Sequence, residues 1–195
     1  MYYIVGLGNP GKEYELTRHN SGRIAVLDFV KKEGIDGLKF DKKLNALVGK
    51  VKIGKKEAQI ILPETFMNKS GFSLKPIITS KKRAENLIVV HDDVDLPLGK
   101  IKISFGKKSA GHKGVESVIK NIKTKKFIRI RIGISKETKK GVAQKPRVEK
   151  FLDYIIGKFK TEELRVIKKV SRTITSGLEI IVTEGVSKAM SLYNN

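Results

Sequence analysis

Short apolar runs and alternating patterns predict six β-strands, and helical periodicity predicts five helices between and after them. The predicted strands are Tyr2–Val5, Leu47–Ile53, Ala58–Leu62, Leu87–Val90, Lys100–Ser104 and Ile128–Ile134. The predicted helices are Gly22–Lys32, Ser70–Ile78, Gly114–Ile122, Val148–Ile155 and a long one from Glu162 to about Glu184. Because strands alternate with helices, the pattern indicates an α/β fold.

Local signals set the ends of the long helix and mark one irregular segment. Thr161 is a natural N-cap, the two glutamates after it suit the first turn, and Gly185 stops the helix. Residues 135–147 are basic and poor in apolar side chains. We expect them to form a mobile hinge or clamp, with a plain surface connection as the alternative.

The chain length favours one domain spanning residues 1–195. No apolar run approaches the eighteen or so residues that would span a bilayer, so we expect no membrane partner. We find neither the basic start nor the cleavage site of a secretory signal, and cysteine is absent. A soluble, cytoplasmic protein without disulfides or a thiolate metal site is therefore expected.

The charge balance points to a polyanionic partner. Lysine and arginine number 41 against 20 acidic residues, which gives a net charge of +21. Such an excess attracts nucleic acid or an anionic surface. Many lysines occur as scattered pairs, so a general drift of composition towards lysine is the alternative explanation.

Three glycines near the start of the chain have the G-x-G-x-x-G spacing of a dinucleotide site, which would make the protein an oxidoreductase. They are Gly6, Gly8 and Gly11. In such sites a helix opens within the motif, so that its amides face the pyrophosphate. Here Pro10 breaks the helix, and a polar loop separates the glycines from the first helical pattern. The context therefore argues against this interpretation, and the absence of a thermal shift on adding NAD would exclude it.

Polar clusters follow several predicted strands or begin helices, and each holds a residue suited to catalysis. They contain His19, Asn68, the run His91-Asp92-Asp93, and His112. Since ligands of open α/β sheets bind beyond the carboxyl ends of strands, we expect these clusters to converge on one face. A histidine bonded to a carboxylate acts as a general base, and asparagine amides orient water and an oxyanion.

Attack by water on an activated ester is the simplest chemistry for this set of residues. The chain has no cysteine nucleophile and no G-x-S-x-G elbow for a serine nucleophile. The carboxylates of Asp92, Asp93 and Asp95 could instead bind a hard cation, but their spacing matches no fixed ligand pattern. We therefore expect neither a metal nor another cofactor.

Several motifs together closely resemble those of the bacterial peptidyl-tRNA hydrolases. The resemblance runs in order from residue 2 to about 159 and rests on residues 5–11, Tyr14, residues 17–20, 65–71, 91–99, 129–134 and 153–159. It implies a twisted mixed β-sheet flanked by helices, usually in a monomer and without a metal. It also implies hydrolysis of the ester between a peptide and the 3′ end of tRNA.

The resemblance also implies roles for individual residues. His19 would be the base, Asp92 its orienting carboxylate, and Asn9 and Asn68 the amides that position substrate and water. Phe66 and Met67 would line the pocket for the peptide, and Tyr14 would contact the substrate. The residues expected at the tRNA end of the substrate are Lys102, His112, Lys113 and Arg131.

One residue departs from the family pattern. The family commonly reads Gly-His-Asn-Gly where this chain has Gly111-His112-Lys113-Gly114. Lysine can hold a phosphate as a point charge but gives up the amide hydrogen bonds of asparagine. This substitution supports the alternative of a non-catalytic RNA-binding relative. The intact His19 and Asp92 favour an enzyme.

Overall fold

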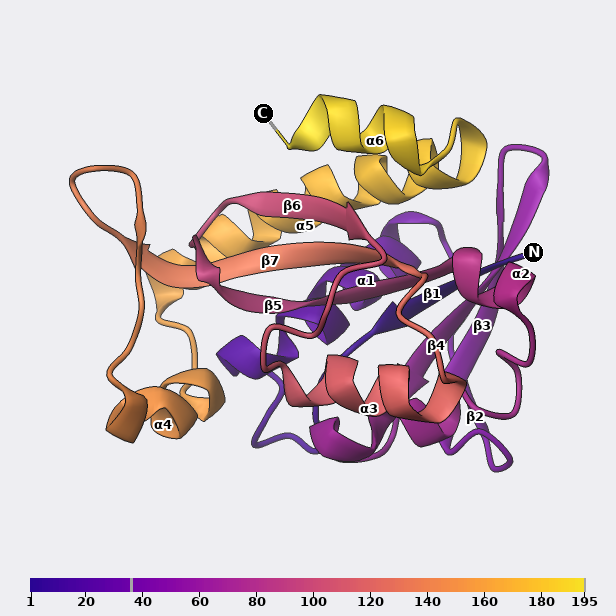
Figure 1. Ribbon diagram of the computed structural model, residues 1–195, viewed down its shortest axis with the longest axis horizontal. Coiled ribbons are helices and arrows are strands. Elements are labelled where there is room, and N and C mark those ends of the chain that lie inside the picture. The colour runs from indigo at the N-terminus through magenta and orange to yellow at the C-terminus, as the bar shows by residue number, and fades with distance from the viewer. Residues whose placement is uncertain (36, 195) are drawn as a thin grey trace.

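A mixed β-sheet forms the centre of the molecule, seen in a computed structural model that describes residues 1–35 and 37–194 (Figure 1). Its strands run in the order β2-β3-β4-β1-β5-β7-β6, and β8 pairs with β7. They are β1 (Tyr2–Gly6), β2 (Lys39–Asp41), β3 (Ala46–Ile53), β4 (Lys56–Pro63), β5 (Leu87–Pro97), β6 (Ile101–Phe105), β7 (Ile128–Glu137) and β8 (Ala143–Gln144).

The four central strands β4, β1, β5 and β7 are parallel, and the others pair antiparallel. The predicted mixed α/β sheet is thus confirmed. Val5 pairs with Val89, so the ends of β1 and β5 lie side by side. This register places the loop after β1 next to the polar half of β5.

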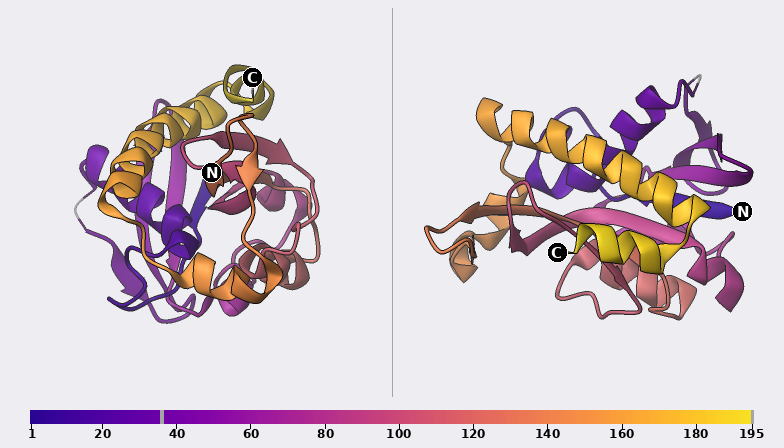
Figure 2. Two further views of the ribbon diagram at one scale, coloured as in Figure 1. Left: turned by 90° about the vertical axis from the view of Figure 1, so that its left-hand side faces the viewer. Right: turned by 90° about the horizontal axis from the view of Figure 1, so that it is seen from above.

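Helices cover both faces of the sheet (Figures 1 and 2). One face packs against α1 (Ser21–Lys32), α5 (Thr161–Thr183) and α6 (Val186–Tyr193) through Ile88, Val90 and their neighbours. The other face packs against the 3-10 helix η2 (Met67–Ser73) and α3 (Lys113–Ile122) through Val5 and Val89. Because β5 is buried on both faces, its first half reads as an unbroken apolar run. The remaining helices are α2 (Lys81–Glu85), α4 (Phe151–Ile156), η1 (Arg18–Asn20) and η3 (Val148–Lys150).

A glycine contact brings the start of α1 against β5. A Cβ atom on Gly22 would come within 2.1 Å of the Val90 carbonyl oxygen, so this approach requires glycine. The same carbonyl accepts a hydrogen bond of 3.0 Å from the Leu7 amide. The turn before α1, which carries His19, is therefore held against the middle of β5, at Val90.

Several predicted elements differ from the structure. The helix expected at Ser70–Ile78 is instead the 3-10 segment η2, because Gly71 lies against the Ser117 carbonyl and Pro76 lacks an amide proton. Lys160, not Thr161, is the N-cap of α5, and its amide donates to Glu163 at 2.7 Å. Gly185, with φ of 101°, follows the end of α5 as expected. Among the described residues, the sequence patterns missed five short elements, namely β2, β8, η1, α2 and α6.

Residues 135–147 contain more order than expected. The end of β7 and β8 form a short antiparallel pair in which Lys136 opposes Gln144. Lys145 also forms an ion pair of 2.6 Å with Asp95. Whether the segment moves stays a prediction. Within residues 1–35 and 37–194, none of the helices is both long and apolar enough to cross a membrane.

Candidate active site

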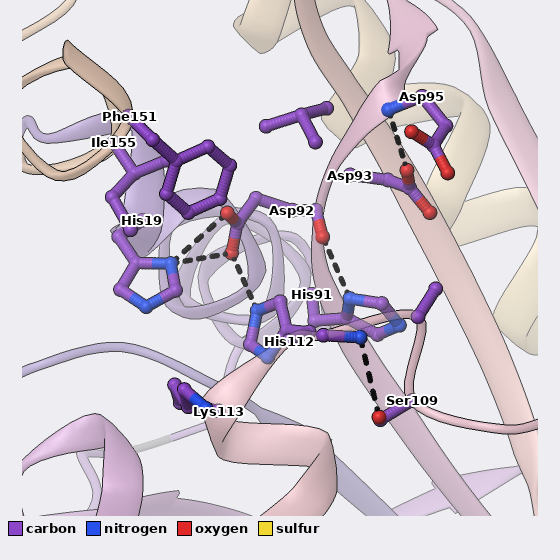
Figure 3. A pocket seen from close by; sticks show the side chains of 13 residues that line it. His19, His91, Asp92, Asp93, Asp95, Ser109, His112, Lys113, Phe151 and Ile155 are labelled. Carbon is purple, nitrogen blue, oxygen red and sulfur yellow. Dashed lines mark hydrogen bonds and ion pairs between the residues drawn. The ribbon is translucent and has the colours of Figure 1, made fainter. Parts of the chain in front are cut away.

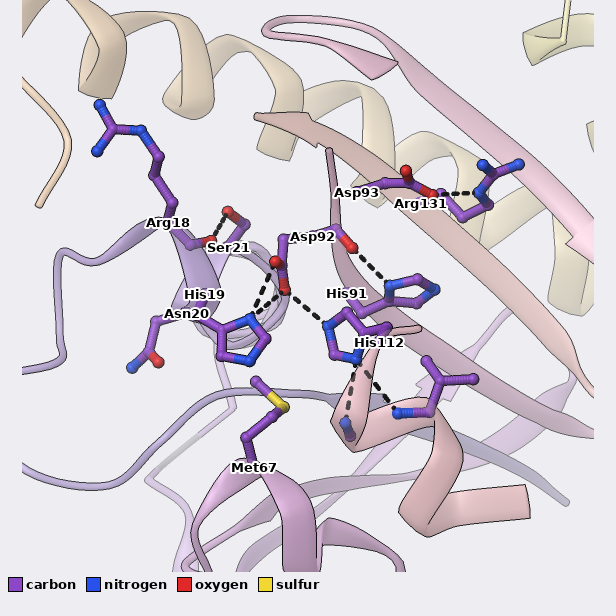
Figure 4. Close-up of polar contacts among 12 residues, drawn as sticks. Arg18, His19, Asn20, Ser21, Met67, His91, Asp92, Asp93, His112 and Arg131 are labelled. Atoms are coloured by element: carbon purple, nitrogen blue, oxygen red, sulfur yellow. Dashed lines mark hydrogen bonds and ion pairs between the residues drawn. The ribbon is translucent and has the colours of Figure 1, made fainter. Parts of the chain in front are cut away.

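The predicted polar clusters meet at the carboxyl ends of β1 and β5 (Figure 4). His19 comes from η1, Asp92 from β5, His112 from the residue before α3, and Met67 from the start of η2. The predicted convergence on one face is confirmed for these four residues. Asp92 lies within β5 and not after it, because β5 continues to Pro97 beside β7.

His19 and Asp92 form a buried pair. The Nδ1 atom of His19 lies 3.0 Å from each carboxylate oxygen of Asp92. The two residues are only 7% and 3% exposed. A carboxylate can only accept, so Nδ1 carries the proton and the lone pair of neutral His19 is on Nε2. This nitrogen faces away from Asp92 (Figure 3).

His112 is the second donor to the same carboxylate. Its Nε2 donates to Oδ1 of Asp92 at 2.8 Å. Its Nδ1 accepts from the amides of Gly114 and Val115 at 3.1 and 3.2 Å, so the side chain also caps α3. Those two amides fix the tautomer, because they require a lone pair on Nδ1. His112 therefore acts on Asp92 as a neutral donor.

The environment shifts the pKa values of this group in different directions. Burial lowers the pKa of His19, but the charge and hydrogen bonds of Asp92 outweigh it and leave the pKa above the ordinary 6.5. Burial raises the pKa of Asp92, but His19 and His112 hold it well below its usual range. Asp92 thus stays ionised and favours a proton on His19.

Asn9 is held by Asn20, and both residues line a different groove from the hollow that holds His19 and Asp92. The Asn20 side chain accepts from the Asn9 amide at 2.8 Å and donates to the Asn9 carbonyl at 2.9 Å. The Asn9 side-chain oxygen accepts from the Met67 amide at 2.8 Å. This last bond determines the orientation of the side-chain amide and leaves its NH₂ group to donate elsewhere. Sequence reasoning missed Asn20, whose only signal was its place in the polar run after His19.

Arg18 anchors the turn that carries His19. Its guanidinium donates to Glu163 at 2.8 and 3.0 Å and to the carbonyls of Gly157 and Lys158 at 3.3 and 3.1 Å. It also stacks over the ring of Tyr154 at 4.6 Å. These contacts fix η1 to the segment between α4 and α5. The position of His19 therefore depends on the C-terminal part of the chain.

None of the residues expected at the peptide end lines the hollow that holds His19 and Asp92. Met67 is 4% exposed and lies next to His19 (Figure 4). Phe66 is 57% exposed and meets Tyr14 edge to face at 6.4 Å. Asn68 is exposed and lines an adjacent groove, not the hollow that holds His19 and Asp92. Lys113 lines both spaces and forms an exposed ion pair of 3.2 Å with Glu116.

Lys102 and Arg131, expected at the tRNA end, lie directly opposite each other on β6 and β7. Lys102 is exposed, whereas Arg131 Nε donates to Asp93 at 2.5 Å. Asp93 is the partner that the sequence did not reveal. The two basic residues therefore differ in how much free charge they present.

The hollow has further walls that the sequence did not predict. Phe151 and Ile155 lie close to His19 and Asp92, and the loop with Ser109 closes another side (Figure 3). His91 is fully buried behind His112, and its Nδ1 donates to the Asp92 carbonyl at 2.7 Å. Its Nε2 has no hydrogen-bond partner in the described part of the chain. Burial, His112 and Arg129 lower the pKa of His91 well below 6.5, so this ring is neutral.

Three potential metal ligands lie close together, but their atoms are already engaged. One ligating atom each from His19, Asp92 and His112 lies within 4.8 Å of the others. The two imidazole nitrogens donate protons to the carboxylate, so a cation would have to displace both protons. As it stands, the carboxylate of Asp92 accepts a hydrogen bond from each of the two imidazoles. That no metal is needed remains a prediction.

Comparison with known proteins identifies the family. The model of the peptidyl-tRNA hydrolase family matches residues 3–195. The chain belongs to the peptidyl-tRNA hydrolase family. The predicted resemblance is thus confirmed, and with it the assignment to a family of enzymes.

Relatives within the peptidyl-tRNA hydrolase family match along their whole length. The peptidyl-tRNA hydrolase of Thermodesulfovibrio yellowstonii is 41% identical over 198 residues, covering 100% of this chain and 99% of its own. That of Alkaliphilus oremlandii is 36% identical, with 100% of each chain covered. The crystal structure of peptidyl-tRNA hydrolase from Acinetobacter baumannii superposes with a TM-score of 0.88 at 31% identity, covering 100% of this chain and 94% of that one.

Proposed function

We propose that this protein hydrolyses the ester bond that joins a peptide, or an N-blocked amino acid, to the 3′ end of tRNA, and so releases free tRNA. Membership of the peptidyl-tRNA hydrolase family supports the reaction. The observation that carries the mechanism is the buried pair of His19 and Asp92, with the Nε2 lone pair of His19 left free.

In the proposed mechanism, His19 acts as the general base. Its Nε2 takes a proton from a water molecule while the water oxygen attacks the ester carbonyl carbon. Asp92 fixes the tautomer and stabilises the imidazolium that forms. When the carbon–oxygen bond to the tRNA breaks, His19 returns the proton to the departing ribose oxygen. The products are a free carboxylic acid and a tRNA hydroxyl.

Asn9 and Asn68 position the substrate in this proposal. The Asn9 NH₂ group donates to the oxyanion of the tetrahedral intermediate, because its side-chain oxygen is occupied by the Met67 amide. Asn68 lies at the edge of the opening, where it can contact the substrate beyond the ester. Tyr14, Phe66 and Met67 line the peptide side.

The tRNA end is assigned to the basic residues on the other side of His112. Lys102 and Arg131 contact phosphates of the acceptor end, with His112 and Lys113 at the junction. Contacts of this kind are indifferent to base sequence, which suits an enzyme that accepts many tRNAs. We further propose that the protein is a monomeric, single-domain enzyme of the cytoplasm that needs no metal or other cofactor.

The first test is release of free tRNA from an N-blocked aminoacyl-tRNA, compared with the unblocked aminoacyl-tRNA and with the variant His19→Ala. We expect release only from the blocked substrate, and a loss of roughly 10²–10⁴-fold in rate for the variant. Near-normal turnover by His19→Ala would show that His19 is not the base. Tight tRNA binding without release by the unmodified protein would identify a non-catalytic RNA-binding relative.

A further inference from the structure

A basic groove leads away from the catalytic hollow between η2 and α3. The side chains that matter along it are Asn68, Phe72, Lys75, Lys113, Lys120 and Lys123. Lys113 lines this groove and also lines the hollow with His19 and Asp92. The groove and the candidate active site therefore adjoin at Lys113. Helix α3, which forms one wall, runs along the lower front of the molecule in Figure 1.

The groove carries free positive charge. Lys75, Lys120 and Lys123 are exposed, and none of them forms a salt bridge within residues 1–35 and 37–194. Glu116 is the one acidic side chain along the groove, and it pairs with Lys113. The positive charge also continues past Lys123, where Lys81 and Lys126 line a neighbouring hollow. A ligand in the groove thus meets uncompensated ammonium groups.

The position of the groove determines which part of the substrate reaches it. The two substituents of an ester carbonyl group leave the reacting carbon in different directions. On the proposed function, the tRNA lies towards Lys102 and Arg131 on β6 and β7. The groove lies along η2, which begins at Met67, and along α3, which is on the far side of the molecule from β6 in Figure 1. The acyl part of the substrate is the part that points into it.

We propose that this groove binds the peptide of peptidyl-tRNA and favours acidic side chains there. The inference rests on the proposed function and deepens it, because it names a substrate class. Exposed Phe72 supplies an apolar surface between the lysines, so an aliphatic side chain next to an acidic one would bind best. Attraction between opposite charges along the groove supplies the selectivity.

The spacing of the lysines specifies which peptide residues are selected. An α-helix rises about 1.5 Å per residue, so Lys120 and Lys123 lie about 10 and 15 Å beyond Lys113 along α3. An extended peptide covers about 3.3 Å per residue. The third to fifth residues from the ester therefore reach Lys120 and Lys123. A single N-acetylated amino acid ends before them.

The test compares three substrates built on one tRNA. These are an N-acetylaminoacyl-tRNA, a pentapeptidyl-tRNA with aspartate at the third to fifth residues from the ester, and the same pentapeptidyl-tRNA with asparagine there. The groove variant is the double substitution Lys120→Gln/Lys123→Gln. The matched control is Lys168→Gln/Lys169→Gln, which removes two exposed lysines of α5. The quantity measured is kcat/KM, at low and at high salt.

The unmodified protein is expected to prefer the aspartate peptide about tenfold over the asparagine peptide, or about threefold for each exposed lysine. The groove variant should bring this ratio close to one, and the control should keep it. High salt should also abolish the preference, because the charges are exposed. An unchanged ratio in the groove variant overturns the inference.

Two other outcomes separate this inference from the proposed function. An equal loss by the groove variant on all three substrates would mean that the groove holds RNA, which overturns the assignment to the peptide. Cleavage of all three substrates by the unmodified protein without any preference overturns the inference alone. Failure to cleave any of them overturns the proposed function, and the inference with it.

Discussion

His112 Nε2 donates a 2.8 Å hydrogen bond to Asp92 Oδ1, on the carboxylate that also accepts from His19. The sequence predicted His112 at the tRNA end of the substrate, and the structure places its ring beside that of His19, with the ring centroids 4.9 Å apart. A donor to one oxygen of a carboxylate withdraws electron density from that carboxylate, which then holds a proton on its other partner less strongly. We therefore expect His112 to lower the basicity of His19, with which it forms no direct hydrogen bond.

The substitution His112→Asn tests this relationship. Asparagine is a good N-cap, so α3 keeps its capping group, but the shorter side chain cannot reach Asp92. We expect kcat to fall about tenfold, as for the loss of one hydrogen bond. The acidic limb of the pH–rate profile should move to higher pH, because Asp92 then holds the proton on His19 more strongly. An unshifted profile would contradict this role.

The pH dependence of the reaction follows from the raised pKa of His19. Protonated Nε2 cannot accept a proton from water, so kcat/KM should rise with pH and reach half its maximum above pH 6.5. In Asp92→Asn the charge that raises the pKa is gone and burial remains. The midpoint should then move to lower pH while the rate falls roughly 10³-fold. A midpoint that stays unchanged in Asp92→Asn would exclude control by this carboxylate.

His91 makes the folded protein sensitive to acid. Its pKa is lowered in the fold, so below pH 6.5 the unfolded chain binds a proton that the native ring does not. The stabilisation is present above pH 6.5 and is lost as the pH falls. Between pH 7.5 and 5.5 the free energy of unfolding should drop by about 1.4 kcal/mol more in the unmodified protein than in His91→Phe. Urea denaturation at the two pH values measures this difference, and equal drops would contradict it.

Asn9→Asp separates the two functions of the Asn9 side chain. One oxygen can still accept from the Met67 amide, so the fold should be kept. The donor to the oxyanion is replaced by a carboxylate oxygen, which repels developing negative charge. We expect a loss of about 10²–10³-fold in kcat with a circular dichroism spectrum like that of the unmodified protein. Retention of more than a tenth of the activity would show that Asn9 does not stabilise the oxyanion.

Lys102 and Arg131 should differ in their effect on salt dependence. Lys102 is free, so a phosphate contact from it releases a counterion, whereas the charge of Arg131 is already matched by Asp93. Lys102→Gln should reduce the slope of log kcat/KM against log salt by about one. Arg131→Gln should change the slope less but destabilise the fold, since it leaves Asp93 buried and unpaired. Equal slope changes would contradict the distinction.

The sequence predicted the convergence of the clusters because strand ends in parallel sheets follow a general rule. It could not predict how the polar groups pair, because those pairs join distant segments. Strand β5 is an example of an element whose end the sequence did not predict. Its predicted end at Val90 rested on the polar run that follows, yet the strand continues because His112 and Arg131 satisfy the carboxylates of Asp92 and Asp93.

The hydrogen bonds between Asn9 and Asn20 could not be predicted from the sequence either, although these residues are close along the chain. Asn20 and Asn9 are eleven residues apart in an irregular loop, and no periodic pattern places one against the other. The shift of the α5 cap from Thr161 to Lys160 is a smaller error of the same kind. At this helix end the Glu163 side chain accepts from the amide of the N-cap residue Lys160 itself, a contact that the sequence pattern around Thr161 did not indicate.

The contacts of Arg18 can form only after most of the chain has been synthesised. All the hydrogen-bond acceptors that hold its guanidinium lie at or beyond residue 157. Because synthesis proceeds from the N-terminus, His19 is made early, whereas these acceptors are made only when most of the chain is present. The turn that carries His19 is thus held in place only late in synthesis. At that stage the growing chain is still joined by an ester to a tRNA of its own.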